Sequence, residues 1–304
     1  TEPSGPSVRA PITQMGRMAA KQKASRGLAV AMCCVALAVG GCAGEDTSTP
    51  LDQARAANQS RHVSTAFDDH PVVLDDTNGL VSSEYFFNTS ETLVVSDSSV
   101  EAQLRAASIA AYAHAPMLVY DEDHHGQITQ EVKRLKTFTL LTVGDVAIAP
   151  ASGSVRVYRD PGGIDALGKM TSVRFHERPV HDPADAQEVI ADLDTSVPTW
   201  LHANWAEPQV MPNAVAKPFP VHSRRDADMA PQVVATRASS IASIANARAF
   251  GARVTMVDNP DPRESEDTLL AMAGLADAPL IALGTQFEPA SDIPERIMQA
   301  EEKY

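Results

Sequence analysis

Two stretches of the chain alternate short apolar runs with Ala-rich or amphipathic segments in the same order, and this pattern constrains the fold most. They occupy residues 91–144 and 232–284, and matching positions such as Val94 and Val234 are 140 residues apart. Strands that alternate with helices return to a parallel neighbour through right-handed crossovers. The sequence therefore predicts an α/β fold, in which duplicated βαβαβ units form a mostly parallel, doubly wound sheet.

The expected elements follow from the length of each apolar run and from the polar residues that bound it. In the first copy we expect strands at 91–96, 116–120 and 137–144 and helices at 100–113 and 127–135. In the second copy we expect strands at 232–236, 253–258 and 278–284 and helices at 241–250 and 263–275. Between the copies, the pattern predicts strands at 155–160 and 173–177, a helix at 185–193 and an irregular connection at 198–222. A last helix is expected at 289–300.

The N-terminal region has the organisation of an export signal. Three basic residues at 21, 23 and 26 precede an uncharged apolar run at 27–41, which ends in Gly-Gly before Cys42. This run is shorter than the roughly 20 residues that a membrane-spanning helix needs. The junction resembles the lipobox of bacterial lipoproteins. That resemblance implies cleavage before Cys42, lipidation of its sulfur, and a location at the outer face of the cytoplasmic membrane.

These patterns divide the chain into five parts. We expect a signal peptide with its upstream segment at 1–41, a flexible tether at 42–65 with a helical turn near 51–57, and a first α/β unit at 66–150. A connecting insert at 151–230 and a second α/β unit at 231–304 complete the chain.

Charge and cysteine content exclude several classes of protein. The net charge is −14, and without residues 1–41, which hold five basic side chains and one acid, 20 basic and 38 acidic groups give −18. Such a surface repels polyanions, so nucleic acid is not an expected partner. The three cysteines are Cys33, Cys34 and Cys42. The chain after Cys42 therefore has no disulfide, no Cys-based zinc site and no thiol nucleophile.

The first unit has two valines in its first strand, a Ser-Asp-Ser turn, an Ala-rich helix and a last strand that ends in Val143-Gly144. In these features it resembles the bacterial cell-wall-binding repeat of type 2, and the second unit resembles it more loosely. The resemblance covers about 110 residues and implies an α/β fold and binding of a cell-wall polymer. The chain departs from the family in three ways: the Ala-rich helix lacks the usual opening Asp, two repeats are visible where three are usual, and the body is acidic. In the first unit the matching residues are Val94-Val95, Ser96-Asp97-Ser98, Ala106-Ala107, Ala110-Ala111, Ala115-Pro116, Leu118-Val119, Asp121, Asp123 and Val143-Gly144. In the second they are Val233-Val234, Ala247, Gly251-Ala252, Val257-Asp258 and Leu283-Gly284.

Polar residues directly follow the expected strands, where open α/β sheets bind their ligands. If one sheet is continuous through both units, these residues line one crevice, and we take them as the candidate ligand-binding set. The loop at 121–125 (DEDHH) has the residue types of a divalent metal site, but we favour its interpretation as a solvated turn. The loop at 258–262 is typical of a rigid turn. The candidate residues are Ser96, Asp97, Ser98, Asp121, Asp123, Asp258 and Asn259.

The sequence contains no nucleophile elbow, phosphate-binding Gly-rich loop or dinucleotide fingerprint, so we assign no catalytic residue and no cofactor. His202 and His222 have no partner at metal-ligand spacing. The leading interpretation is a non-enzymatic envelope lipoprotein that binds cell-wall material or an envelope protein, with its membrane contact through the lipid anchor. The alternatives are a solute-binding lipoprotein and an envelope hydrolase that uses crevice carboxylates.

Overall fold

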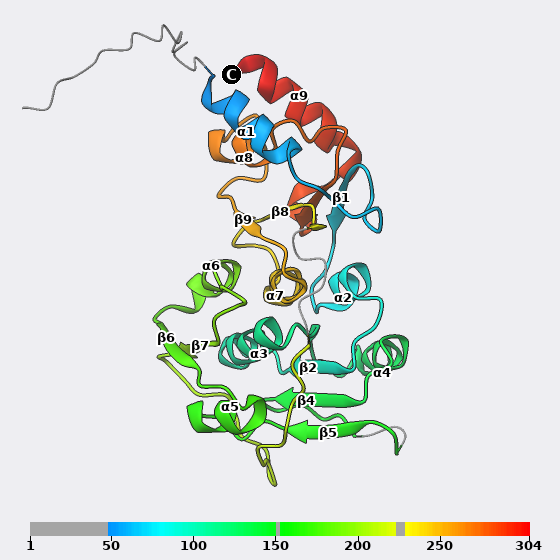
Figure 1. The fold of residues 1–304 in the computed structure, drawn as a ribbon, viewed down its shortest axis with the longest axis vertical. Helices are drawn as coiled ribbons and strands as arrows, with labels where there is room; N and C mark the ends of the chain where they lie inside the picture. Colours follow the sequence, from blue (N-terminus) through cyan, green and yellow to red (C-terminus); the bar gives the residue numbers. More distant parts are fainter. Residues whose placement is uncertain (1–47, 150–152, 223–228) are drawn as a thin grey trace, which may run out of the picture. The chain divides into compact units, whose positions relative to one another are not determined.

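The computed structural model describes residues 48–149, 153–222 and 229–304. The predicted export segment at 1–41 and the predicted lipidation site Cys42 lie outside the described residues. In the described part, every strand pair is parallel and helices alternate with strands along the chain (Figure 1). The predicted α/β class is therefore confirmed.

The two predicted units have the same internal strand order. In each, the first strand is central, the second lies on one side of it and the third on the other. Apart from the half-buried second strand of the second unit, the strands are short, buried and rich in Val and Leu, as parallel strands covered on both faces should be. The first unit contains β2 (Thr92–Ser96), α3 (Val100–Ala113), β3 (Met117–Val119), α4 (His125–Arg134) and β4 (Thr139–Val143). The second contains β8 (Gln232–Ala235), α7 (Ile241–Phe250), β9 (Val254–Met256), α8 (Glu266–Met272) and β10 (Leu280–Leu283).

The units do not share one sheet, and each sheet takes its fourth strand from outside the predicted unit. The two orders are β3-β2-β4-β5 and β1-β10-β8-β9. β1 (Pro71–Leu74), which precedes the first unit, pairs with β10 of the second. β5 (Arg156–Arg159), from the predicted insert, pairs with β4. The predicted boundaries at 66 and 151 therefore do not separate the sheets. Each added strand pairs with the open edge of a sheet whose other strands belong to a different predicted part of the chain.

The predicted insert contains a third, shorter unit of the same kind. β6 (His176–Val180) and β7 (Thr199–Ala203) form a two-stranded parallel sheet, and α6 (Ala186–Ala191) connects them. The expectation of an irregular chain from residue 198 is thus wrong for β7, where Trp200 and Leu201 are buried. The helix α5 (Ile164–Thr171), which precedes β6, was also not expected. It directly follows Pro161-Gly162-Gly163, residues that are typical of a turn.

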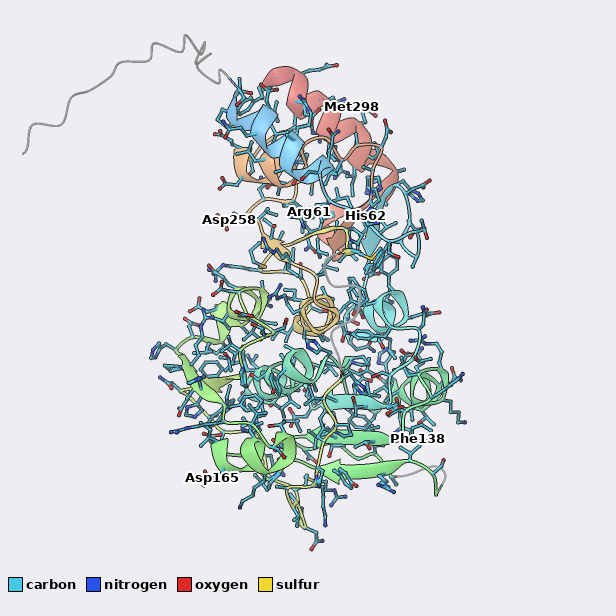
Figure 2. All side chains as sticks on the ribbon, viewed as in Figure 1. Arg61, His62, Phe138, Asp165, Asp258 and Met298 are labelled. Carbon is cyan, nitrogen blue, oxygen red and sulfur yellow. The ribbon has the colours of Figure 1, made fainter. Side chains whose placement is uncertain are left out.

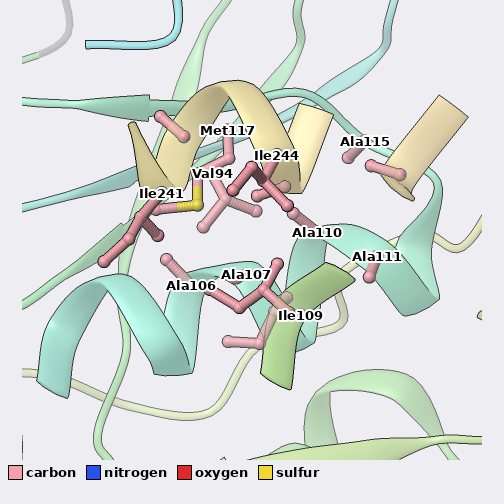
Figure 3. Close-up of a cluster of buried hydrophobic side chains, with 14 of the residues drawn as sticks. Val94, Ala106, Ala107, Ile109, Ala110, Ala111, Ala115, Met117, Ile241 and Ile244 are labelled. Carbon is pink, nitrogen blue, oxygen red and sulfur yellow. The ribbon is translucent and has the colours of Figure 1, made fainter. Parts of the chain in front are cut away.

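The core lies where α3 packs against α7 (Figure 3). Small side chains on α3 allow the helices to approach closely, and Ile241 and Ile244 of α7 fill the space above them. Val94 of β2 and Met117 of β3 close the cluster on the sheet side. Close packing of this kind makes the contact between α3 and α7 sensitive to any increase or decrease in side-chain volume. The small residues of α3 are Ala106, Ala107, Ala110 and Ala111.

The segment predicted as a tether contains a packed helix, and this prediction is corrected for the part that the structure describes. α1 (Pro50–Gln59) begins with a capping box, in which Thr49 accepts a hydrogen bond from the Asp52 amide and Asp52 accepts one from the Thr49 amide. Leu51 is buried among residues of α8 and α9 (Ile293–Lys303). Asn58 donates to main-chain carbonyls at the end of α8. The capping box is a recognisable start signal that the compositional argument overlooked.

Other elements of the described residues are α2 (Leu80–Phe86), between β1 and β2, and short 3-10 turns at 183–185, 285–287 and 290–292. Among the described residues, no helix has both the length and the apolar character needed to cross a lipid bilayer.

Candidate functional site

Asp97 follows β2 and connects the start of α3 to the loop after β4. Its Oδ1 accepts hydrogen bonds from the amide and hydroxyl of Ser99, at 2.8 and 2.6 Å. Its Oδ2 accepts from the amide of Asp145 at 2.8 Å. Ser99 in turn caps α3 by accepting from the Ala102 amide. Both carboxylate oxygens of Asp97 thus accept hydrogen bonds that hold the start of α3 and the loop after β4.

The two serines beside Asp97 differ in accessibility. Ser96 is completely buried, and its Oγ has no hydrogen-bond partner among the described residues. Ser98 is exposed, and its carbonyl accepts from the Gln103 side chain at 3.0 Å.

The contact between Asp97 and Gly144 gives a prediction for stability. Gly144 has a φ of +83°, and a Cβ there would lie 2.0 Å from Asp97 Oδ2. We expect Gly144→Ala to lower the free energy of unfolding by about 2–4 kcal/mol, from the left-handed backbone and from the clash. Urea denaturation followed by circular dichroism measures this. The matched control is Gly126→Ala in α4, where a Cβ meets nothing within 4 Å. That change should stabilise the protein by about 0.5–1 kcal/mol, and equal effects of the two substitutions would contradict the account.

The acidic loop after β3 begins α4. Asp121 accepts hydrogen bonds from the His124 amide at 2.8 Å and from His124 Nδ1 at 2.6 Å. Desolvation opposes the charge of Asp121, but the hydrogen bonds from His124 outweigh it and hold the pKa of Asp121 below its usual value. Asp123 is exposed. Within the described residues, no group of three or more His, Cys, Asp or Glu side chains is arranged to hold a metal ion.

Asp258 and Asn259 follow β9, in the other sheet (Figure 2). Asp258 is exposed. Asn259 Oδ1 accepts from the Asp261 amide, and its carbonyl accepts from the Thr268 hydroxyl. The predicted crevice depended on one sheet that continues through both units. The units form two separate sheets, so this requirement is not met. Asp97 and Asp121 do share one sheet edge, because Ser96 pairs with Val119.

A polar pocket of about 450 Å³ lies between α2 and α4, beside the carboxyl end of β1. We call it the α2–α4 pocket. Gln127 and His124 line it from α4 and the preceding loop, so the loop singled out in the sequence does reach a cavity. The residues that line it are Asp75, Asp76, Thr77, Asn78, Leu80, Val81, Glu84, His124, Gln127, Gln130, Glu131 and Arg134.

Two buried polar groups fix the β1 side of the α2–α4 pocket. Asp76 is buried and accepts from the amides of Gly79 and Ser82, at 2.8 and 2.9 Å, which holds the first turn of α2. The carbonyl of Asn78 accepts from the Val119 amide at 2.8 Å, which ties this loop to the end of β3. No residue on this side of the pocket is among the candidates predicted from the sequence. The signal was present, because an apolar run (PVVL) followed by Asp-Asp-Thr-Asn has the same strand-then-polar pattern as the loops that were chosen.

An ion pair fixes the α4 side. Glu131 is buried, and it accepts hydrogen bonds from both Arg134 and the hydroxyl of Ser83 in α2. The hydrogen bonds that Arg134 donates to Glu131 raise the pKa of Arg134. The guanidinium is thus neutralised within the wall. Asp75 and Glu84 are exposed, and neither forms a salt bridge with a described residue, so the mouth of the α2–α4 pocket is electronegative.

The fold and site thus define an α/β protein of three parallel units with a polar, electronegative pocket. No family model matches the sequence, and no curated protein matches it. Among solved structures, Cwp6 from Clostridium difficile is similar with a TM-score of 0.45 and 13% identity, over 75% of this chain and 48% of that one. Cwp8 from Clostridium difficile has a TM-score of 0.46 and 12% identity, over 78% of this chain and 52% of that one. The chain spans about half the length of both, and a likeness at this level assigns no function.

Proposed function

We propose that this protein is a non-enzymatic lipoprotein of the cell envelope, anchored through Cys42, that binds cell-wall glycan in the α2–α4 pocket. The observation that carries the proposal is the pocket itself. Carboxylate and amide groups of Asp75, Glu84, Gln127 and Gln130 line it, and such groups form paired hydrogen bonds with neighbouring sugar hydroxyls. The order of basic, apolar and Gly-Gly-Cys segments before residue 43 supports export and anchoring.

The charge of the pocket selects among cell-wall polymers. Among the described residues that line it, four are carboxylates and one is a guanidinium already paired with Glu131. The net charge of the chain is also negative. An anionic polymer would be repelled at long range. The ligand that fits is therefore a neutral, hydroxyl-rich glycan.

A pull-down with purified cell walls tests this proposal. We expect the full chain to be retained, and retention to persist after anionic polymers have been stripped from the walls with acid. The double variant Asp75→Ala/Gln127→Ala should weaken retention about tenfold, because it removes two groups that line the pocket. The control Asp277→Ala/Gln209→Ala removes an exposed acid and an exposed amide elsewhere and should leave retention unchanged. Loss of retention on stripped walls, or equal weakening by both double variants, would count against the proposal.

The anchor is tested separately. We expect Cys42→Ala to move the protein from the membrane fraction to the soluble fraction and to abolish labelling by a palmitate analogue, because the acylated sulfur is lost. Ser48→Ala, within the same polar stretch, is the control and should be processed normally. If the Cys42→Ala protein remained membrane-bound and labelled, the lipoprotein assignment would be wrong.

A solute-binding lipoprotein is the second candidate, because a pocket of about 450 Å³ is also large enough for a free monosaccharide or amino acid. A thermal-shift screen separates the two. A solute binder should be stabilised by one free small molecule, whereas a wall binder should respond only to longer glycan fragments.

A further inference from the structure

We propose a second binding site, selective for an organic cation, where the C-terminal ends of α3 and α7 meet. A cavity of about 500 Å³ lies there, and we call it the helix-end pocket. Its walls include Phe86, Phe87, Glu91, His114, His222 and Phe250. Glu91 precedes β2, so this pocket lies at the amino end of that strand, whereas the α2–α4 pocket lies beside the carboxyl ends of β1 and β3. The proposal does not depend on the wall-binding function.

The two helix ends make the helix-end pocket electronegative. α3 ends at Ala113 and α7 ends at Phe250. His114 Nδ1 lies 3.2 Å from the carbonyl oxygen of Ala249, and this contact joins the two helix ends. A helix C-terminus carries about half a negative charge on its last carbonyl groups. The last turn of α3 contains no basic residue. Arg248 stands in the last turn of α7 and donates to the carbonyls of Ala252 and Leu193, so its positive charge offsets part of that helix end and α3 supplies the larger share of the negative charge.

Glu91 adds a full negative charge. Its side chain is exposed and forms no salt bridge with any described residue, while its carbonyl is used by the amides of Phe138 and Thr139. Among the described residues that line this pocket, none is Lys or Arg. A carboxylate beside two helix C-termini attracts a positive charge and repels an anion.

Aromatic rings determine which kind of cation fits. Phe250 packs against Phe86 and Phe87, with ring centroids 5.5 and 6.2 Å apart, so the three rings form one apolar wall. A strongly hydrated metal ion gains nothing from such a wall. An alkylammonium group gains both apolar contact and attraction to the ring faces, worth about 0.5–2 kcal/mol. The chemistry of the pocket therefore matches an amine or quaternary ammonium group with an attached carbon chain.

Isothermal titration of the full chain with choline tests the site, with 3,3-dimethylbutan-1-ol as the uncharged probe of the same shape. We expect choline to bind and the alcohol to bind at least about fivefold more weakly, because only the cation gains the electrostatic attraction. Glu91→Gln should weaken choline binding about fivefold, and Phe250→Leu by a similar factor. Glu122→Gln is the matched control, since it removes an exposed carboxylate from the loop before α4.

Equal affinity for the cation and the alcohol would overturn the proposal, and so would equal effects of Glu91→Gln and Glu122→Gln. A normal melting curve for Glu91→Gln shows that any loss is local. Retention on cell walls should not change in Glu91→Gln. The proposal for the helix-end pocket and the proposal for the α2–α4 pocket can therefore be disproved independently.

Discussion

Substitution of Arg105 by Met is expected to lower the free energy of unfolding by about 3–5 kcal/mol, because it leaves the buried carboxylate of Asp160 without its ion-pair partner. Arg105 of α3 donates from Nε and Nη2 to Asp160, at 2.8 and 3.0 Å. The side chains are only 1% and 2% exposed. The guanidinium also lies 5.1 Å from the ring centroid of Trp200 in β7. One residue thus joins the first unit, the end of β5 and the short middle unit.

Urea denaturation measures this effect, and two further variants show its cause. Arg178→Met removes a surface pair with Asp192, whose side chains are 40% and 72% exposed, and should cost less than about 1 kcal/mol. The double variant Arg105→Met/Asp160→Leu removes both buried charges and should recover most of the loss. A loss below about 1 kcal/mol for Arg105→Met, or no recovery in the double variant, would show that the pair does not join the units as described.

Substitution of Asn246 by Ala is expected to cost about 3–4 kcal/mol. Asn246 of α7 is fully buried. Its Oδ1 accepts from the Met117 amide at 2.6 Å, and its Nδ2 donates to the carbonyls of Gly79 and Met117 and to the Ser82 hydroxyl, at 2.8–3.0 Å. Each buried partner left without a hydrogen bond costs about 1–3 kcal/mol.

The conservative variant Asn246→Asp separates hydrogen bonding from volume. Aspartate keeps the side-chain shape and the oxygen that accepts from the Met117 amide. Its second oxygen, however, replaces Nδ2 and faces the carbonyl oxygens of Gly79 and Met117, so this variant should destabilise the protein about as much as Ala does. Asn204→Ala, at an exposed asparagine that contacts His181, is the control and should change stability by less than about 0.5 kcal/mol. A stable Asn246→Asp protein would mean that packing alone, and not the polar contacts, holds α2, β3 and α7 together.

Local signals predicted the central helices accurately. α3 and α7 begin and end at the predicted residues. The reason is that Ser99 and Ser240 each cap their helix by accepting a hydrogen bond from an amide three residues later, which is a signal carried by neighbouring residues. The strands of both units were found because each is a short buried run between polar turns.

Long-range pairing could not be predicted in the same way. β1 and β10 are adjacent in space although some 200 residues separate them, and no local pattern specifies that partner. The candidate site shows the same limit. The positions of Asp97 and Asp121 at neighbouring strand ends follow from the sequence, but their use as caps depends on Ser99, Asp145 and His124. Asp258 was grouped with them only because one continuous sheet was assumed.

The most direct test of the account is to observe where glycan contacts the protein. The measurement is the change in backbone amide NMR shifts of the full chain when soluble, uncharged glycan fragments of the cell wall are added. We expect the changes to concentrate at residues 75–84 and 124–134, which form the α2–α4 pocket. An absence of changes at saturating glycan, or changes confined to other elements, would contradict the assignment of that pocket as the wall-binding site.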